Sequence, residues 1–354
     1  MNLGHGGNVQ EICRKYNIDE DHIVDFSANI NPLGLSSKVR LRMIDALDKI
    51  ERYPDITYYD LKSSLSKYEG IDISNILLGN GAAEVIFNIV RGMKPKKVLL
   101  PAPTFSEYED AVKSIGGEIK YYILNKENFI LDDEFIENID ESIDMTFICN
   151  PNNPTGRLTS KEYIIKVLEK SKETNTIVVM DESFLDFVYN KEKYSAINLC
   201  KEYSNLIIVK SLTKFFAFPG IRIGYGITNN YNFINIINSI SIPWSINTVA
   251  AEGAIVALDE EEYKRETVKY VNEEKLFLYE ELNKFEELNV YEGAVNFIFF
   301  KINSNLNLRE ELIKEGILIR SCSNYIGLDE RYYRVAVRTR RENIKLLNDL
   351  KKVL

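Results

Sequence analysis

Short apolar runs alternate with amphipathic stretches along the middle of the chain. The apolar runs predict strands at residues 76–78, 97–100, 119–124, 145–149, 177–180, 206–209 and 223–227. Helices are predicted between most of them, for example at 160–172 and at 82–93, where Val85, Ile86 and Ile89 recur at helical spacing. Apolar strands that alternate with helices are typical of a parallel sheet covered on both faces. We therefore expect an α/β fold with a mostly parallel sheet.

The last third of the chain follows a different pattern. A long, charged helix is predicted at 261–288, followed by a strand at 294–302, a helix at 306–315, strands at 317–320 and 332–338, and a closing helix. This order is typical of an α+β unit. The first 35 residues are too few to form a core alone, so we expect them to pack onto this unit. The prediction is a large α/β domain at 36–255 and a smaller α+β domain made of 1–35 and 256–354.

Composition limits both the size and the partners of the protein. The 354 residues are 45% hydrophobic, which is enough for one large core and a smaller one. The formal net charge of −9 argues against general binding to nucleic acids or anionic membranes, but it allows a local basic pocket. No segment is long and apolar enough to span a membrane, and the start MNLGHGGN is unlike a secretion signal. We expect a cytoplasmic protein.

Cysteine and histidine are too few and too scattered for a disulfide framework or a zinc site. The four cysteines show no CxxC spacing, and only two histidines occur. We therefore expect reduced thiols and no bound metal.

Polar residues gather where predicted strands end. The loop 150–156 follows one strand, Asp181 ends another, and the segment 211–214 follows a third. Ligands of α/β sheets bind at the carboxyl ends of the strands. We expect these residues to form one site.

Lys214 is the residue with the most distinctive surroundings. It lies in Ser-Leu-Thr-Lys-Phe-Phe-Ala-Phe-Pro-Gly-Ile-Arg-Ile-Gly-Tyr, residues 211–225. A lysine amine can form a Schiff base with an aldehyde cofactor when it is unprotonated, and burial favours that neutral form. The hydroxyls of Ser211 and Thr213 and the guanidinium of Arg222 suit a phosphate. A lone lysine would more simply be solvated, and a lone arginine would more simply form an ion pair.

Other residues of the site admit two interpretations each. Asp181 can pair with a pyridinium nitrogen or cap a helix. The turn-rich loop 150–156 is either a connection or the source of an amide for a ring hydroxyl. The segment Gly79-Asn80-Gly81-Ala82-Ala83 opens a helix whose N–H groups suit a phosphate. Phe105 either stacks on a ring or belongs to the core.

Taken in chain order, these motifs resemble the fold-type I pyridoxal-5′-phosphate (PLP) enzymes, the aspartate-aminotransferase superfamily. The resemblance covers nearly the whole chain. It implies PLP as cofactor, with Lys214 as the Schiff-base lysine, Asp181 on the pyridine nitrogen and Asn153 on the ring oxygen. The remaining implied contacts are Phe105 on the ring face and a phosphate cup of Ala82, Ala83, Ser211, Thr213 and Arg222. The Ala82-Ala83 pair departs from the usual polar residues, but the backbone donors survive.

Two branches of the superfamily resemble this chain: the histidinol-phosphate aminotransferases and the threonine-phosphate decarboxylases of cobalamin synthesis. The opening His5-Gly6-Gly7-Asn8 and the segments 25–34, 243–247 and 317–325 resemble the decarboxylases. Phe184 stands where the aminotransferases usually carry tyrosine. This branch implies decarboxylation of O-phospho-L-threonine to (R)-1-amino-2-propanol O-2-phosphate. Transamination of histidinol phosphate is the alternative, and so is decarboxylation of phosphoserine, which lacks one methyl group.

The resemblance also implies residues outside the cofactor site. A small phosphorylated amino acid offers an amine, a carboxylate and a phosphate, and the implied substrate-binding residues are His5, Gly6, Asn29, Asn153, Arg320 and Arg334. The motif assigns Arg334 to the carboxylate and Arg320 with His5 to the phosphate, although the two arginines could exchange roles. Tyr53 resembles the tyrosine that reaches the neighbouring subunit's cofactor, which implies a homodimer.

Orientation decides which bond of a PLP adduct breaks, because only the bond perpendicular to the ring overlaps its electrons. A decarboxylase and an aminotransferase can therefore share every cofactor contact. The sequence leaves the proton donor after CO₂ loss open, and Lys214 is one possibility.

Overall fold

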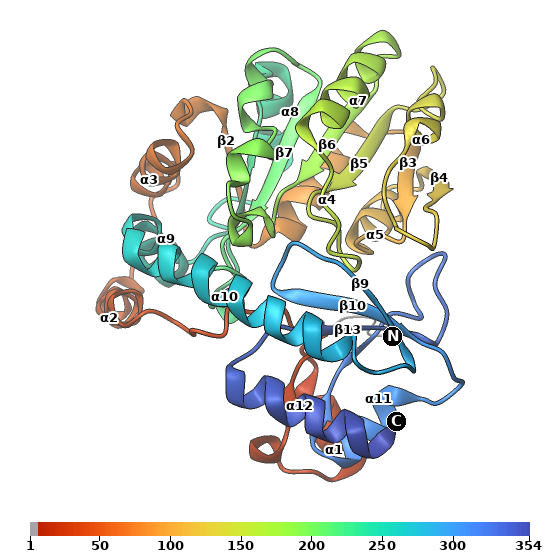
Figure 1. Cartoon of the computed structure of the whole chain (residues 1–354). Helices are drawn as coiled ribbons and strands as arrows, with labels where there is room; N and C mark the ends of the chain where they lie inside the picture. The colour runs from red at the N-terminus through yellow and green to blue at the C-terminus, as the bar shows by residue number, and fades with distance from the viewer. Residues whose placement is uncertain (1–5) are drawn as a thin grey trace.

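A computed structural model describes residues 6–354 and contains a seven-stranded sheet, which lies in the upper half of Figure 1. The spatial order of its strands is β2 (Ile76–Gly79), β8 (Gly224–Ile227), β7 (Leu206–Ser211), β6 (Ile177–Asp181), β5 (Met145–Cys149), β3 (Lys97–Ala102) and β4 (Glu118–Ile123). Strand β8 runs antiparallel to both of its neighbours, and the other described pairs are parallel. The predicted α/β fold with a mostly parallel sheet is confirmed.

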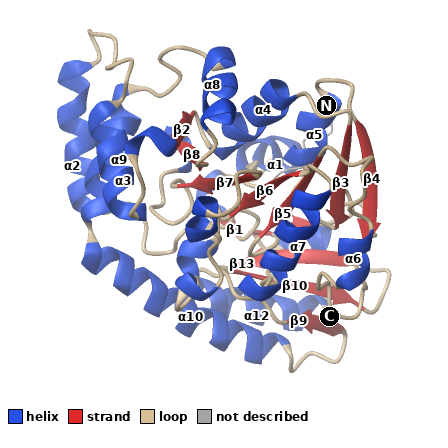
Figure 2. Ribbon diagram, turned by 90° about the horizontal axis from the view of Figure 1, so that it is seen from above, coloured by secondary structure: helices blue, strands red, loops and turns tan. Residues whose placement is uncertain are grey.

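Alternate residues of these strands face two separate apolar layers. In β6, Val178 and Met180 face one layer and Val179 faces the other. Helices α4 (Ala82–Met93), α5 (Glu107–Lys113) and α8 (Tyr231–Ile240) cover the face with Val179. The opposite face is covered by α3 (Tyr59–Glu69), α6 (Asp133–Glu137), α7 (Lys161–Glu173) and α9 (Thr248–Asp259) (Figure 2). Burial on both faces explains why the strands are apolar throughout.

Strand β3 is longer than the pattern predicts. It continues through Pro101 to Ala102, although proline cannot donate to a sheet ladder. Its pairing with β5 has already ended at Leu99, so Pro101 removes no donor from that ladder.

The long helix α10 (Glu261–Leu282) connects the large sheet to the rest of the chain (Figure 1). It is six residues shorter than the predicted helix 261–288. Leu288 instead begins strand β9 (Leu288–Tyr291), where its Cα pairs with that of Ile302. An apolar residue at helical spacing also satisfies a strand, so periodicity alone misplaced this boundary.

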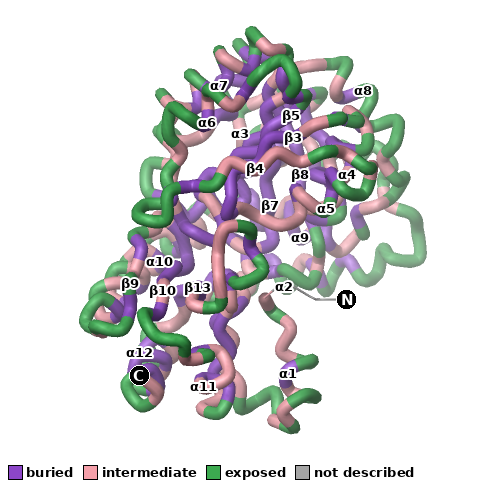
Figure 3. The backbone as a smooth tube through the Cα atoms, turned by 90° about the vertical axis from the view of Figure 1, so that its right-hand side faces the viewer, coloured by how far each residue is buried: buried purple, intermediate pink, exposed green. Residues whose placement is uncertain are grey.

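A second sheet of four antiparallel strands forms the other end of the molecule. Its order is β12 (Arg320–Ser321), β13 (Tyr332–Ala336), β10 (Phe297–Ile302) and β9. Helices α11 (Leu308–Lys314) and α12 (Arg340–Val353) lie against it (Figure 3). Their buried leucines share a core with Phe26. The predicted strand 317–320 is two strands, because β11 (Ile317–Leu318) pairs with β1 (Val24–Asp25) rather than with β13.

The remaining described α-helices are α1 (Val9–Tyr16) and α2 (Ser37–Asp45), and short 3-10 helices lie in the connections between elements. Within residues 6–354 every helix is too short or too polar to cross a membrane, and no cluster of metal-ligating side chains occurs. The four cysteines are free thiols.

Candidate active site

One pocket lies where the carboxyl ends of β3, β5, β6 and β7 meet the start of α4. It encloses about 450 Å³ of empty space, including its opening to solvent. Nine predicted site residues line it together: Ala82, Ala83, Phe105, Asn153, Asp181, Ser211, Thr213, Lys214 and Arg222. These residues are up to 140 positions apart in the chain, and the fold brings them to one place.

Lys214 follows β7 and directs its amine into this pocket. The Nζ atom lies 4.9 Å from the centre of the Phe184 ring. Burial lowers the pKa of Lys214, and Asp181 and Cys149 oppose this while Arg222 and Arg334 reinforce it. A lowered pKa increases the share of neutral amine, which is the form that attacks an aldehyde.

Asp181 ends β6 with its side chain almost fully buried. Its Oδ2 accepts a 2.7 Å hydrogen bond from the hydroxyl of Tyr108, and its Oδ1 accepts one of 2.9 Å from the backbone N–H of Ser183. Two donors hold the carboxylate in one orientation. Such an acceptor, in a pocket that also holds Lys214, suits a protonated ring nitrogen.

The other end of the pocket is built for an anion. Ala82 and Ala83 begin α4, whose free N–H groups and dipole favour negative charge. Gly81 has a φ of +91°, and a Cβ there would lie 2.7 Å from Nη2 of Arg222. A Cβ on Gly224 would lie 2.3 Å from the nitrogen of Ala82. Both glycines are therefore needed for Arg222 and the helix start to come together. The hydroxyls of Ser211 and Thr213, 2.9 Å apart, lie in the same pocket.

Arg334 lies on β13 of the second sheet, with its guanidinium buried next to the pocket. Its Nη1 donates to Oδ1 of Asn153, and its Nη2 donates to the carbonyl of Ser27 at 2.9 Å. When the Asn29 amide is oriented with its oxygen toward Arg334, that oxygen accepts from Nη1 at 3.1 Å and from Nε at 3.3 Å. Burial lowers the pKa of Arg334. Three acceptors from two segments of the chain, residues 27–29 and Asn153, thus fix a planar cation at the site.

The other predicted substrate residues lie near Arg334. The Cα of Arg320 on β12 pairs with that of Arg334, and its Nη2 donates to Asn324 at 2.8 Å. Gly6 lies so close to Ser27 that a Cβ would come within 2.1 Å of the Ser27 carbonyl oxygen. Gly6 therefore lies beside Ser27, the residue whose carbonyl accepts from Arg334. His5 lies outside the described residues.

Tyr53 does not join the pocket of its own protomer. Its side chain is 81% exposed, and its ring packs against Trp244 with the centroids 4.9 Å apart.

Sequence reasoning missed Tyr108, Ser183 and Cys149. Tyr108 contacts Asp181, while Ser183 and Cys149 line the pocket. The Ser183 Oγ is buried and, among residues 6–354, meets no hydrogen-bond partner. Ser183 and Cys149 adjoin predicted residues along the chain, and that adjacency is the signal that could have identified them.

A buried network of charged side chains includes Lys210 of β7. The Lys210 ammonium, fully buried, lies 2.9 Å from Glu69 and 3.5 Å from Asp186. Burial would raise the pKa of Asp186, but Lys191 and Lys210 hold it well below its usual range. Lys210 is four residues before Lys214, so the network fixes the strand that precedes the site lysine.

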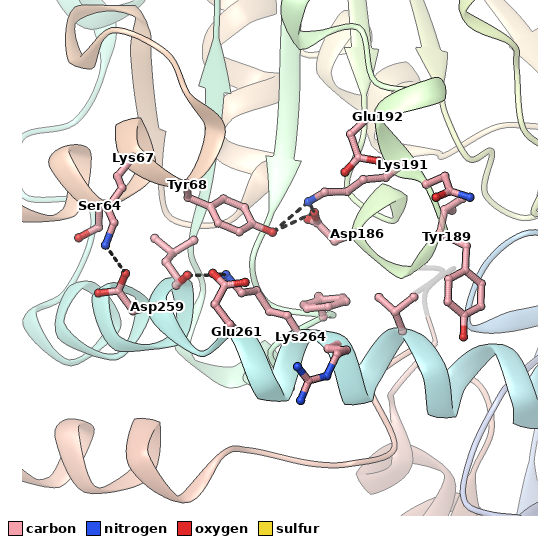
Figure 4. Close-up of a pocket in the computed structure, with 16 residues that line it drawn as sticks. Ser64, Lys67, Tyr68, Asp186, Tyr189, Lys191, Glu192, Asp259, Glu261 and Lys264 are labelled. Carbon is pink, nitrogen blue, oxygen red and sulfur yellow. Dashed lines mark hydrogen bonds and ion pairs between the residues drawn. The ribbon is translucent and has the colours of Figure 1, made fainter.

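This network borders a separate open cavity, shown in Figure 4, with about 1630 Å³ of empty space including its opening to solvent. The Tyr68 ring lies 4.9 Å from the ammonium of Lys191 and 4.7 Å from that of Lys264. Lys191 pairs with Asp186, and Lys264 pairs with Glu261. The charges of this cavity are therefore balanced, in contrast to the anion-binding end of the first pocket.

The residues of the first pocket fit PLP. An amine, a buried carboxylate, an aromatic ring and a phosphate-type donor set meet in one space. The orphaned Ser183 hydroxyl also indicates a ligand, because buried polar groups normally have partners.

Comparison with known proteins identifies the family. The model of the family Aminotransferase class I and II matches residues 21–350. The threonine-phosphate decarboxylase of Salmonella typhimurium is 37% identical, over 100% of this chain and 97% of that protein.

Two solved structures are similar over most of their length. The histidinol-phosphate aminotransferase from Clostridium acetobutylicum is 35% identical with a TM-score of 0.87, covering 93% of this chain and 98% of that one. The L-threonine-O-3-phosphate decarboxylase from Porphyromonas gingivalis is 26% identical with a TM-score of 0.84, covering 94% and 99%. As its motifs predicted, the chain belongs to the class I and II aminotransferase family.

Proposed function

We propose that this chain is a PLP-dependent decarboxylase. Its reaction converts O-phospho-L-threonine to (R)-1-amino-2-propanol O-2-phosphate and CO₂ for cobalamin (adenosylcobalamin) biosynthesis. The observation that carries the proposal is a single pocket in which Lys214, Asp181 and a set of phosphate donors meet, with Arg334 bonded to Asn153 in its wall. Similarity to a threonine-phosphate decarboxylase along the whole chain supports this substrate.

The cofactor, when bound, supplies an aldehyde for the substrate amine and a ring that accepts the electron pair left by CO₂. Lys214 provides the amine that holds it, and Asp181 provides the buried acceptor for the ring nitrogen. The start of α4, Ser211, Thr213 and Arg222 bind the cofactor phosphate. Asn153 donates to the ring oxygen, and Phe105 stacks on the ring.

Arg334 orients the substrate. Its guanidinium is held by Asn153, Ser27 and Asn29, so a carboxylate bound to it is held in one orientation. This orientation determines which bond breaks. Arg320, with His5 and Gly6 of the N-terminal segment, binds the substrate phosphate, and exchange of the two arginine roles is the alternative assignment.

Histidinol-phosphate aminotransferase is the second candidate. The similarity to the Clostridium acetobutylicum structure favours it. Phe184 in the pocket wall favours the decarboxylase, because the aminotransferase branch usually carries tyrosine there. Phosphoserine differs from phosphothreonine by one methyl group, which a hydrophobic pocket discriminates by roughly 10–200-fold.

A homodimer is part of this proposal. Large apolar side chains are exposed in two stretches of the chain. The first runs from α2 to the start of α3, and the second covers the end of α8 and the residues after it. The exposed side chains are Leu41, Ile44, Leu47, Ile50, Tyr53, Ile56, Tyr59, Ile240, Ile242 and Trp244. The Tyr53–Trp244 contact joins the two parts of this apolar face. A second copy of the chain would cover the face and carry Tyr53 to the partner's pocket.

We also propose that 36–255 form the cofactor-binding domain of a cytoplasmic enzyme. Residues 1–35 and 256–354 would form the small α+β domain, whose N-terminal arm closes over the substrate. The core shared by Phe26 and the leucines of α12 supports this grouping of the two chain ends.

The decisive assay supplies purified protein and PLP with phosphothreonine, phosphoserine or histidinol phosphate. We expect CO₂ from phosphothreonine and no 2-oxo acid. Turnover only of histidinol phosphate together with 2-oxoglutarate would establish the aminotransferase instead.

Lys214→Ala supplies the matched test of the cofactor site. We expect loss of turnover and of the borohydride-trapped label that peptide mapping places on residue 214. Lys193→Ala, at an exposed lysine, should keep both. Full turnover in Lys214→Ala would refute the assignment.

A further inference from the structure

Tyr108 is a fully buried residue that contacts two parts of the site at once. Its hydroxyl donates to Oδ2 of Asp181 over 2.7 Å. Its ring stacks on Phe147, with the centroids 4.7 Å apart, and meets Phe105 edge-on at 5.6 Å. Packing on both rings leaves the hydroxyl one direction, toward the carboxylate.

The direction of this hydrogen bond is fixed by chemistry. Burial raises the pKa of Tyr108 well above its usual value, and the charge of Asp181 raises it further. The hydroxyl therefore stays protonated and donates, while an ionised carboxylate only accepts. The Cys149 thiol also lies beside the Tyr108 hydroxyl, and this thiol donates to the Pro151 carbonyl at 3.2 Å.

Two hydrogen bonds fix the position of the Asp181 carboxylate. The hydroxyl of Tyr108 donates to its Oδ2, and the backbone N–H of Ser183 donates to its Oδ1. A carboxylate fixed in this way in the pocket lining can accept a hydrogen bond from a protonated ring nitrogen and so stabilise the protonated ring.

We propose that Tyr108 is a positioning residue of the reaction, which acts through Asp181 to keep the pyridine nitrogen of the cofactor protonated. This inference rests on the proposed function, because it requires PLP in the pocket. It assigns to this tyrosine the control of how strongly the ring withdraws electrons.

The test uses the holoenzyme reconstituted with PLP that carries nitrogen-15 in its ring. Tyr108→Phe keeps both ring contacts and removes only the hydroxyl. We expect the ring-nitrogen NMR signal to move toward that of unprotonated pyridine. We also expect kcat to fall about tenfold with little change in KM, the order of one hydrogen bond to a charged group.

Tyr333→Phe is the matched control. Tyr333 is also fully buried, and its hydroxyl accepts from the N–H of Leu308 at 3.2 Å, away from the pocket. Its variant should lose some thermal stability and keep the wild-type nitrogen signal and kcat.

The outcomes separate the two proposals. A wild-type nitrogen signal in Tyr108→Phe, with only a lower Tm, would overturn the role of Tyr108 and leave the proposed function standing. Failure of the wild-type protein to bind PLP at Lys214 would overturn both.

Discussion

Glu182, next to Asp181, is fully buried and paired only with neutral donors. Its Oε1 accepts from the N–H of Ala196 at 2.6 Å, and its Oε2 accepts from Ser195 at 2.9 Å. Burial raises its pKa from 4.5 to about 7, although Lys210 and these donors pull it down. The folded state therefore holds a proton that the unfolded state has already lost between these two pH values.

We predict that this proton makes stability depend on pH. The stabilising effect is complete below pH 4.5 and is lost as the pH rises through about 7, which amounts to about 3 kcal/mol. Glu182→Gln cannot carry this charge. The difference between its free energy of unfolding and that of the wild type should therefore increase by this order, in favour of the variant, between pH 5 and pH 8. Urea denaturation at several pH values measures it. Glu192→Gln, at an exposed position, should show no trend, and a constant gap for Glu182→Gln would refute the prediction.

Sequence reasoning identified the site residues that belong to recognisable local motifs. Lys214 and Arg222 stand in one segment, and Asp181 ends an apolar run, so the expected pocket could be assembled from the order of strands. Tyr108 could not be found this way. Its partner Asp181 is 73 residues away, and a tyrosine on the buried face of a helix, here with Ala111 and Val112, is normally part of the core.

At the scale of the element, α12 shows how a helix start is fixed. Thr339 and Glu342 form a capping box, in which the Thr339 N–H donates to Glu342 at 3.1 Å and the Glu342 N–H donates to the Thr339 hydroxyl at 3.4 Å. The helix packs Leu346, Leu347 and Leu350 into the core of the second sheet. Loss of the cap should therefore weaken that core.

We predict that Thr339→Ala lowers the free energy of unfolding by about 1 kcal/mol, the usual effect of removing such a cap. Thr339→Ser keeps the hydroxyl and should stay within a few tenths of wild type. Denaturant titration followed by circular dichroism distinguishes them. Equal losses in the two variants would show that the hydroxyl is not what matters.

Elements were predicted well where one pattern alone fits the residues. Helix α4 and strand β5 have the bounds that periodicity indicates. Predicted bounds were wrong in two situations. In one, the same residues fit a helix and a strand, and in the other, pairing with a partner strand determines where a strand begins and ends. Leu288 suits a helix or a strand, and the run 317–320 is divided between two sheets by its partners. Strand direction, as in β8, leaves no trace in the periodicity of a buried strand.

At the scale of the whole molecule, the exposed apolar face and the pocket appear as two unconnected features of one protomer. The homodimer proposed above links them, because Tyr53 lies on the face and is 81% exposed. A tyrosine hydroxyl that reached a phosphate in the partner would complete a site that one chain leaves open. If each pocket uses Lys214 of one chain and Tyr53 of the other, the activity of a dimer of two different variants depends on whether both substitutions fall in the same pocket.

Mixed dimers of two inactive or weakened variants test the arrangement directly. Tyr53→Phe should reduce activity about tenfold, the order of one hydrogen bond to a charged group, and Lys214→Ala should abolish it. In a mixed dimer, isolated through a different tag on each chain, a Tyr53 that acts across the interface places both defects in one pocket and leaves the other intact. We therefore expect about half of wild-type activity from two defective chains. If Tyr53 serves its own protomer, both pockets are defective, and activity should stay near one twentieth or less, roughly half of the Tyr53→Phe level.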